Sequence, residues 1–503
     1  MDTRISSVVI VGGGTAGWMT AASLAARIGM SGHTRITLVE SDQIGTIGVG
    51  EATVPALVDY LRKLEIDETD FITKTNATFK LAIGFQDWAG KESLFFHPFA
   101  DIGVPIAKVP FQTLWTKMRQ LGRAGSVDDY NLGSQLAMAG KFAVPVKNPT
   151  TGSSMFNYAL HFDANLAARY LSSWARIKGV ERIEGKVASV RQDPESGFVQ
   201  ALELEDGSEV QGDLFVDCTG FRGLLIEQLL KTGYEDWGHW LPCDRAVAMP
   251  CASSGPPPSY TRALAKKAGW QWRIPLQHRV GNGHVYSSDY VSDEEAVAML
   301  EAELGGEALG DPLQLRFRTG VRKKFWNKNV YAIGLSAGFL EPLESTGIYL
   351  IQTGISLLLS NFPSKVHNQL LQDEVNAGQR HHWERIRDFI ILHYWKNGRA
   401  GEPFWDACRA MEVPDELAYM TRLYAGTGRL KLEESDFFQS SSWHYLYTGF
   451  GIVPERYHPS ADDFDEDALA TELRNMAAGM ADAAQRSPMH GDFIAQNCAA
   501  ERT

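Results

Sequence analysis

A single lysine inside an apolar stretch is the first candidate for chemistry in this chain. Lys80 follows Thr78-Phe79 and precedes Leu81-Ala82-Ile83. An amine that is partly removed from water binds its proton less tightly and can act as a nucleophile. The same pattern is also typical of a lysine that buries its aliphatic stem and keeps its charge in water. The residues alone leave both interpretations open.

Two glutamates and a Ser-Thr-Gly sequence precede a second segment of interest. Glu341 and Glu344 stand before Ser345-Thr346-Gly347, and the apolar pattern predicts a helix over residues 348–359. The first amides of a helix have no partner within it and carry partial positive charge, so Thr346 and Gly347 could bind a small anion such as a halide. In the alternative, Ser345 or Thr346 is only the N-cap and the glutamates complement the helix dipole.

Two aromatic clusters offer surfaces on which a flat molecule could stack. One contains His97, Pro98 and Phe99, and the other begins at Trp443. Such rings can stack on a planar substrate, although aromatic clusters are more often part of a hydrophobic core.

Two tryptophans one residue apart form a further unusual pattern. Trp270 and Trp272 are followed by Ile274-Pro275. Because side chains at i and i+2 of a strand point to the same face, this segment predicts a strand with both indoles on one face.

The N-terminus carries a glycine pattern that is typical of dinucleotide binding. A β-branched run, Val8-Val9-Ile10-Val11, leads into Gly12-Gly13-Gly14-Thr15-Ala16-Gly17, with glycines at positions 12, 14 and 17. They allow a tight turn, close approach of a pyrophosphate and close packing of the next helix, predicted over 19–28. A second strand ends at Glu40, roughly 20 residues further on, where a carboxylate can bind ribose hydroxyls. The pattern predicts an adenine dinucleotide without choosing between FAD and NAD.

The remaining elements point to a mixed α/β fold. Strands are predicted over 213–216 and 329–333, and each runs into small residues that let the backbone approach a cofactor. From about residue 363 the pattern is helical, with an amphipathic run over 368–394. The sharpest break, Gly255-Pro256-Pro257-Pro258, predicts a surface loop within one module.

Composition excludes several classes of protein. The chain has 503 residues and a net charge of −13 without a dense basic stripe, which argues against nucleic-acid binding. No apolar run approaches the roughly 20 residues that span a bilayer, so we expect no membrane segment and a cytoplasmic location. The five cysteines are scattered, and we expect them to be reduced and to bind no metal.

Taken together, these motifs resemble those of the flavin-dependent tryptophan halogenases, in family order and over most of the chain. The matching segments are Gly12–Trp18, Gly48–Thr53, Lys80, Asp217–Phe221, Trp270 and Trp272, and Glu341–Ile348. The resemblance implies an FAD-binding, Rossmann-like module of the flavin monooxygenase type over residues 1–362. Substrate-site segments would be inserted at about 60–150 and 235–315. A mainly helical region, residues 363–503, would complete the substrate site.

The resemblance also assigns roles to residues. Lys80 and Glu344 match the essential lysine and glutamate, and Thr346 and Gly347 match the halide-binding backbone. His97 and Phe99 match the pair that sandwiches an indole, and with them Pro98, Ser345 and Trp443 are expected to contact substrate. The segment Gly48–Thr53 matches the strap that joins the flavin and substrate sites. The residues expected to bind the cofactor are Gly12, Gly14, Thr15, Ala16, Gly17, Glu40, Gly50, Ala52, Leu335 and Gly338.

The family chemistry implies a reaction. FADH2, supplied by a separate NAD(P)H-dependent flavin reductase, reacts with oxygen to a flavin hydroperoxide. Attack by chloride or bromide then gives hypohalous acid, which is held at Lys80. The segment Trp443–Gly451 lacks the glutamate with which tryptophan-specific members bind the amino acid. We therefore expect an indole or another small electron-rich aromatic as substrate. The resemblance is also compatible with a homodimer.

Two other classes share parts of the pattern. An FAD-dependent aromatic monooxygenase, that is a hydroxylase, would have the same nucleotide-binding fold but would not need Lys80 or the paired tryptophans. An NAD-binding dehydrogenase, or a flavoprotein without catalysis, would need only the dinucleotide-binding pattern of the first 50 residues, and the other motifs would have no role in it.

Overall fold

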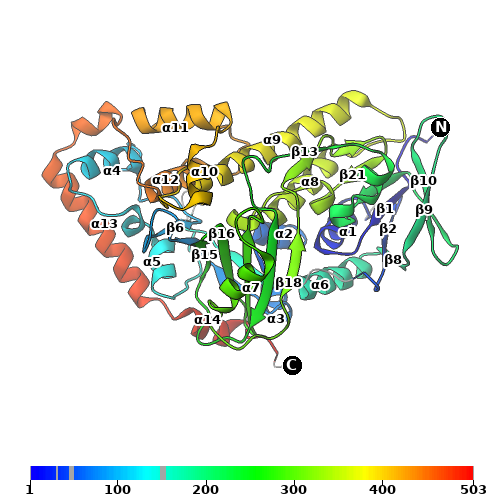
Figure 1. Ribbon diagram of the computed structural model, residues 1–503, viewed down its shortest axis with the longest axis horizontal. Helices are drawn as coiled ribbons and strands as arrows, with labels where there is room; N and C mark the ends of the chain where they lie inside the picture. Colours follow the sequence, from blue (N-terminus) through cyan, green and yellow to red (C-terminus); the bar gives the residue numbers. More distant parts are fainter. Residues whose placement is uncertain (1, 30–31, 45–49, 148–153, 502–503) are drawn as a thin grey trace.

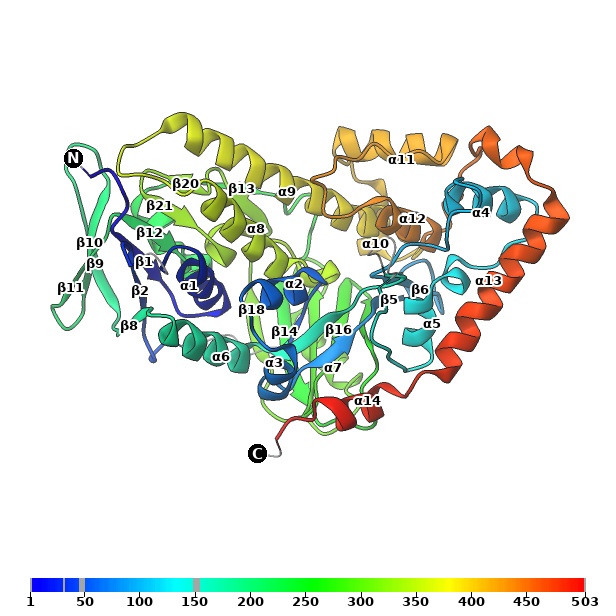
Figure 2. The same ribbon diagram turned by 180° about the vertical axis from the view of Figure 1, so that it is seen from behind.

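The computed structural model describes residues 2–29, 32–44, 50–147 and 154–501. Part of the predicted strap, Gly48-Val49, lies outside these residues. Figures 1 and 2 show an elongated molecule with a sheet carrying the N-terminus at one end, a second sheet in the middle and a helical lobe at the other end.

A six-stranded sheet forms the N-terminal end. Its order is β20-β21-β12-β1-β2-β8, and β1, β2, β8, β12 and β21 run parallel. The strands are β1 (Ser7–Val11), β2 (Arg35–Glu40), β8 (Glu181–Glu184), β12 (Leu214–Asp217), β20 (Trp326–Asn327) and β21 (Val330–Ala332). Four consecutive residues of β1 are buried, as expected of a central strand covered on both faces. The sheet therefore unites three segments that are far apart in sequence.

A seven-stranded sheet of order β18-β14-β17-β16-β15-β5-β6 forms the middle. Its strands are β5 (Ala82–Gln86), β6 (Leu94–Pro98), β14 (Arg245–Cys251), β15 (Tyr260–Lys266), β16 (Gly269–Pro275), β17 (Val280–Tyr286) and β18 (Leu313–Arg316). The predicted tryptophan strand is β16, and the Gly255–Pro258 segment is a loop that joins β14 to β15 within this sheet. Both predictions are confirmed.

The part of the chain that the structure describes also contains three small sheets. Their strands are β3 (Gly50–Ala52), β4 (Thr78–Lys80) and β7 (Ala159–Asp163); β9 (Val187–Gln192), β10 (Val199–Leu204) and β11 (Glu209–Gln211); and β13 (Tyr234–Asp236), β19 (Gly320–Arg322) and β22 (Gly338–Phe339). In the first of them, β7 pairs with both β3 and β4, so the strap and the lysine strand lie on either side of one strand.

The helices surround these sheets, and beyond residue 362 the described elements are helical. They are α1 (Thr15–Arg27), α2 (Ala56–Lys63), α3 (Glu68–Lys74), α4 (Phe111–Gln120), α5 (Leu132–Met138), α6 (Ala164–Ile177), α7 (Asp293–Glu301), α8 (Gly347–Ser360), α9 (Gln369–Trp395), α10 (Pro403–Ala410), α11 (Asp415–Thr427), α12 (Ser440–Gly449), α13 (Glu466–Arg486) and α14 (His490–Asn497). The predicted helices over 19–28, 348–359 and 368–394 correspond to α1, α8 and α9. The mixed α/β fold class is confirmed, while the domain boundary at 362 stays a prediction.

Helix α9 links the two ends of the molecule. Asn368 caps it through the amide of Leu371, and it runs along the upper edge in Figure 1 into the helical lobe. Its first half has one buried face, whereas every residue from Ile386 to Tyr394 is buried. A helix that is buried all round lies inside the protein. The last turns of α9 are therefore core, and their polar side chains must find partners there.

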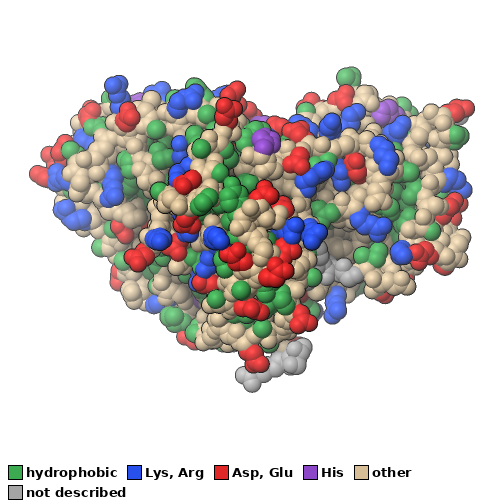
Figure 3. Space-filling view, viewed as in Figure 1, with side chains coloured by type: hydrophobic (Ala, Val, Ile, Leu, Met, Phe, Trp, Pro, Cys, Tyr) green, Lys and Arg blue, Asp and Glu red, His purple; other side chains and the backbone are tan. Residues whose placement is uncertain are grey.

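The surface bears mixed charge. Figure 3 shows Lys and Arg interspersed with Asp and Glu over the face that it presents. Among the described helices, none is both long and apolar enough to cross a membrane.

The close packing of α1 on β1 gives a prediction about stability. A Cβ added at Gly17 would lie 1.9 Å from the carbonyl oxygen of Gly12, whereas one added at Gly14 meets nothing within 4 Å. Gly17→Ala should therefore destabilise the protein by about 1–3 kcal/mol through overpacking, and Gly14→Ala by much less. Chemical denaturation of both variants measures this difference, and equal losses would contradict it.

Candidate active site

A cavity of about 510 Å3 lies at the carboxyl ends of the parallel strands. The predicted cofactor residues that line it are Gly12, Gly14, Thr15, Ala16, Glu40, Gly50, Ala52, Leu335 and Gly338. Gly17 is not part of the lining, because it is buried where α1 packs on the loop. Ligands of open α/β sheets bind at this end of the strands.

The chemistry of the lining fits FAD. The backbone at Gly14 and Gly220 opens into free space, and α1 begins directly behind the glycine loop, so the first amides of this helix would face a bound pyrophosphate. Glu40 accepts hydrogen bonds from Arg182 and, at 3.4 Å, from the indole of Trp18, which fix its carboxylate at the cavity wall. Trp272 adds aromatic surface on the side of the middle sheet.

Lys80 is fully buried behind this cavity. Of the two interpretations of its sequence, the amine removed from water therefore holds, and the lysine with its charge in water does not. Its Nζ donates to the carbonyl oxygen of Thr53 and to Oγ of Ser345, each at 2.8 Å, and lies 5.1 Å from the centre of the Phe99 ring. Burial lowers the pKa of the amine to about 7, although the negative charge of Glu344 opposes the shift. The amine does not reach water but is held by neutral acceptors, so near neutral pH a large share of it is the free base.

Two chain segments join Lys80 to the cavity. Gly50–Ala52 lines the cavity and Thr53 follows it, while Gly347 lines the cavity two residues after Ser345. Ser345 has a left-handed backbone with φ of 60°, which is uncommon for a residue other than glycine. The residue in this left-handed turn is the one whose hydroxyl accepts the hydrogen bond from Lys80.

The start of α8 contains a buried hydroxyl without a partner. Thr346 is the residue before α8, but its side chain makes no capping hydrogen bond. Its Oγ1 is buried and, among the described residues, has no hydrogen-bond partner. Thr346 therefore occupies the N-cap position, as one interpretation had it, but its side chain does not cap the helix, and an unpaired donor lies beside the exposed backbone of Gly347.

Glu344 is held by two histidines. Its Oε2 lies 2.8 Å from Nδ1 of His97 and its Oε1 lies 2.9 Å from Nε2 of His393, and all three side chains are buried. Burial by itself would raise the pKa of this carboxyl, but His97 and His393 outweigh it and lower the pKa to about 2. The two histidines therefore favour the ionised form of Glu344.

Glu341, three residues earlier, has different surroundings. Its Oε2 accepts from Nε1 of Trp270 at 2.7 Å and from the hydroxyl of Tyr394 at 2.6 Å. Burial raises its pKa to about 7, since its partners are neutral. The first tryptophan of the paired motif thus anchors the segment that carries Glu344.

Aromatic rings border the histidine side of Glu344. The His97 ring lies 5.5 Å from Phe389 and 5.9 Å from Phe438, and these two phenylalanines stack at 3.7 Å. Trp443 packs edge-on against Phe389 at 4.8 Å and donates to the carbonyl of Phe438. The structure therefore brings His97 and Trp443 to one aromatic cluster, while Pro98 is buried at the end of β6.

Three residues of this region were not predicted from the sequence as site residues: Phe389, His393 and Phe438. Phe389 and His393 are four apart on α9 and share one face, a spacing that the sequence displays. Phe438 lies in a loop and has no comparable signal.

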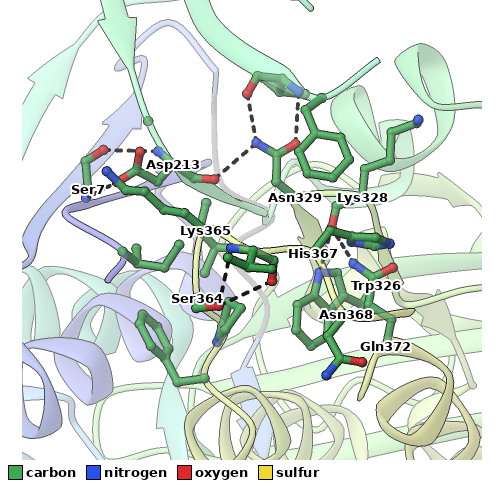
Figure 4. A pocket seen from close by; sticks show the side chains of 18 of the residues that line it. Ser7, Asp213, Trp326, Lys328, Asn329, Ser364, Lys365, His367, Asn368 and Gln372 are labelled. Atoms are coloured by element: carbon green, nitrogen blue, oxygen red, sulfur yellow. Dashed lines mark hydrogen bonds and ion pairs between the residues drawn. The ribbon is translucent and has the colours of Figure 1, made fainter. Parts of the chain in front are cut away.

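A second cleft, of about 1020 Å3, lies at the outer edge of the six-stranded sheet, away from the predicted site residues. Its polar side chains pair across it: Lys365 bonds with Asp213, and Asn329 donates to backbone carbonyls of 199 and 213, as Figure 4 shows. The hydrogen-bonding groups of Lys365, Asp213 and Asn329 therefore already have partners within the protein. Among the described residues, there is no group of His, Cys, Asp and Glu that could hold a metal ion.

The low pKa of Lys80 predicts how stability depends on pH. Between pH 7 and 10.5 the unfolded chain binds a proton at Lys80 that the folded protein does not, so the free energy of unfolding rises with pH in this window. Lys80→Met lacks this rise. The variant should therefore be more stable than the wild type near pH 7, with the advantage vanishing toward pH 10.5. Melting temperatures across this range test it, and a constant difference would mean that the buried amine is protonated.

Comparisons with known proteins agree with this geometry. The sequence model of the tryptophan halogenase family matches residues 7–466. The solved structure of BrvH, a flavin-dependent halogenase from Brevundimonas sp. BAL3, superposes with a TM-score of 0.95 and 46% identity, covering 98% of this chain and 100% of that one. The tryptophan 6-halogenase SttH of Streptomyces toxytricini is 39% identical over 83% of this chain and 84% of its own. The chain therefore belongs to the tryptophan halogenase family of flavin-dependent halogenases, enzymes that use reduced FAD and a halide ion.

Proposed function

We propose that this chain halogenates a small electron-rich aromatic, an indole in particular, at a site formed by Lys80 and Glu344. The proposal rests on the buried amine of Lys80, which has a pKa of about 7 and bonds to Thr53 and Ser345, each within two residues of the cavity lining. When bound, reduced FAD supplies the electrons with which oxygen oxidises halide to hypohalous acid. Family membership favours this reaction over hydroxylation.

The cofactor would be held by the lining of the cavity. Its pyrophosphate would lie on the glycine loop, and the ribose would lie against Glu40. The strap residues Gly50 and Ala52, with Leu335 and Gly338, would enclose the flavin ring. We propose that a separate NAD(P)H-dependent reductase supplies the reduced flavin, as for this family in general. The cavity would bind FAD weakly enough for it to exchange with free reduced flavin.

The halide would bind at the start of α8. The unpaired hydroxyl of Thr346 and the first amides of the helix, beginning with Gly347, are donors without partners within the helix. The partial positive charge of the helix N-terminus favours an anion there. This position lies on the path from the cavity to Lys80.

Lys80 and Glu344 would divide the work at the substrate. The free-base form of Lys80 holds the oxidant by a hydrogen bond or as a haloamine. Glu344 is an ionised carboxylate that polarises the oxidant and accepts the proton that the ring carbon loses. His97, Phe99 and Trp443, with Ser345 at the lysine, would position the ring, and such positioning supplies much of the rate for a reactive arene.

The role of Lys80 predicts the effect of its removal. Lys80→Met should lower halogenation of indole at least about 100-fold, because the oxidant loses its acceptor, while FAD binds as before. Mass spectrometry of products and fluorescence titration with FAD measure the two effects, with an added flavin reductase in the assay.

Lys117→Met is the matched control, since Lys117 is also buried but bonds to the carbonyl of Ala461 in another part of the fold. It should halogenate at close to the wild-type rate. Near wild-type halogenation by Lys80→Met would disprove the site, and an added oxygen in place of halogen would indicate a hydroxylase.

The polarity of α12 predicts the choice of substrate. Residues 440–449 contain no Asp, Glu, Lys or Arg, and their one histidine, His444, bonds to Tyr424 and has a pKa that burial lowers to about 3. The ammonium and carboxylate of free tryptophan would thus lose water without a charged partner from this helix, at a cost above the roughly 2–7 kcal/mol of an unpaired neutral polar group, because both groups are charged. Indole should have a higher kcat/KM than tryptophan in parallel assays. The reverse order would reveal an amino-acid site elsewhere.

A further inference from the structure

His393 is a buried histidine whose two ring nitrogens both face oxygen acceptors. It is fully buried in the last turns of α9. Its Nδ1 lies 2.9 Å from the carbonyl oxygen of Phe389, and its Nε2 lies 2.9 Å from Oε1 of Glu344. A neutral imidazole has one N–H and one lone pair, so it can donate through only one nitrogen.

These contacts fix the number of protons on the pair. A carbonyl oxygen can only accept, so Nδ1 of His393 carries a hydrogen. The bond to Glu344 then has two forms: Nε2 also carries a hydrogen and donates to a carboxylate, or Glu344 is protonated and donates to Nε2. In both forms one proton lies between His393 and Glu344. His97 requires no second proton, because a neutral imidazole with hydrogen on Nδ1 satisfies Oε2.

We propose that His393 is a positioning residue that shares this one proton with Glu344 and lends it during halogenation. The proposal rests on the proposed function and extends it to a residue that does not itself touch the substrate. Without the shared proton, a lone pair on Nε2 would face a carboxylate oxygen at 2.9 Å in a site closed to water. That repulsion would displace Glu344 from its position between the two histidines.

The shared proton balances the reaction. An arene and hypohalous acid give a halogenated arene and water. The ring electrons form the carbon–halogen bond, and the electron pair of the oxygen–halogen bond stays on the departing oxygen. That oxygen needs one proton to become water, and the ring carbon releases one. The pair can give its proton to the oxygen through Glu344 and regain the ring proton, so that it is unchanged after each turnover.

The surroundings of His393 keep the proton in place. Phe85 from β5 lies 4.8 Å from the ring, with Trp88 and Phe450 at 5.9 and 6.0 Å, and all are uncharged. The ionisable groups that face Glu344 are His97 from β6, His393 from α9 and, through its charge, Lys80 from β4. The neighbouring Glu341–Tyr394 pair is bonded to Trp270 on the other side.

Nuclear magnetic resonance of protein with isotope-labelled histidine rings tests the proposal without flavin or substrate. At pH 8 we expect one imidazolium signal that disappears in both His393→Gln and Glu344→Gln. If Glu344 holds the proton instead, infrared spectra should show a carboxylic acid band that Glu344→Gln removes. His284 is the internal control, because it bonds to a carbonyl through Nδ1 but has no carboxylate, and burial lowers its pKa to about 4. Absence of both signals would overturn the proposal, whatever the enzyme catalyses.

Kinetic measurements distinguish a role of His393 in carrying the proton from a role in packing alone. The amide of His393→Gln can still donate to Glu344 but cannot carry the proton, so kcat should fall about 10- to 100-fold, within the range of general acid–base effects, with little change in KM for indole. The alkaline limb of the pH–rate profile should move to lower pH, because buried Glu344 must then bind the proton alone. His284→Gln should leave the profile unchanged. An equal loss at all pH values in His393→Gln would show that the residue only packs.

Discussion

The removal of the Lys80 amine from water is the constraint on which the rest of the site depends. A buried ammonium is costly unless an opposite charge or strong acceptors compensate for it. Here the direct partners are a carbonyl and a hydroxyl, and the nearby carboxylate only partly offsets the burial. The amine therefore loses its proton near neutral pH. The small sheet β3-β7-β4 makes this burial possible, because it fixes both the lysine strand and the strap.

Two glutamates three residues apart show how partners, rather than burial, set the charge of a carboxyl. Both are fully buried, yet the pKa of Glu341 is raised to about 7 and that of Glu344 is lowered to about 2. Glu341 bonds to an indole and a phenol, which remain neutral, whereas Glu344 bonds to two imidazoles, which can be charged. One of the two is thus suited to anchoring the backbone and the other to chemistry.

The arrangement separates the cavity from the reactive lysine by a short length of backbone. The residues that line the cavity at 50–52 and 347 are direct neighbours, or nearly so, of those that bind Lys80. An oxidant formed in the cavity, as we propose, would therefore have a short way to the amine, past the start of α8. In this arrangement a bound cofactor and the buried amine would occupy separate spaces.

Several features of this protein depend only on local sequence pattern. The glycines at 12, 14 and 17, the strand periodicity and the helix over 368–394 follow from neighbours along the chain, and so does Lys80 as an isolated amine among apolar residues. The protonation and hydrogen bonding of these groups depend instead on residues that are distant in the sequence. His97 is 247 residues from Glu344 and His393 is 49 away, and Ser345 is 265 from Lys80. Burial and long-range hydrogen bonds set pKa values and proton positions, and no periodicity records which distant residue a side chain will meet.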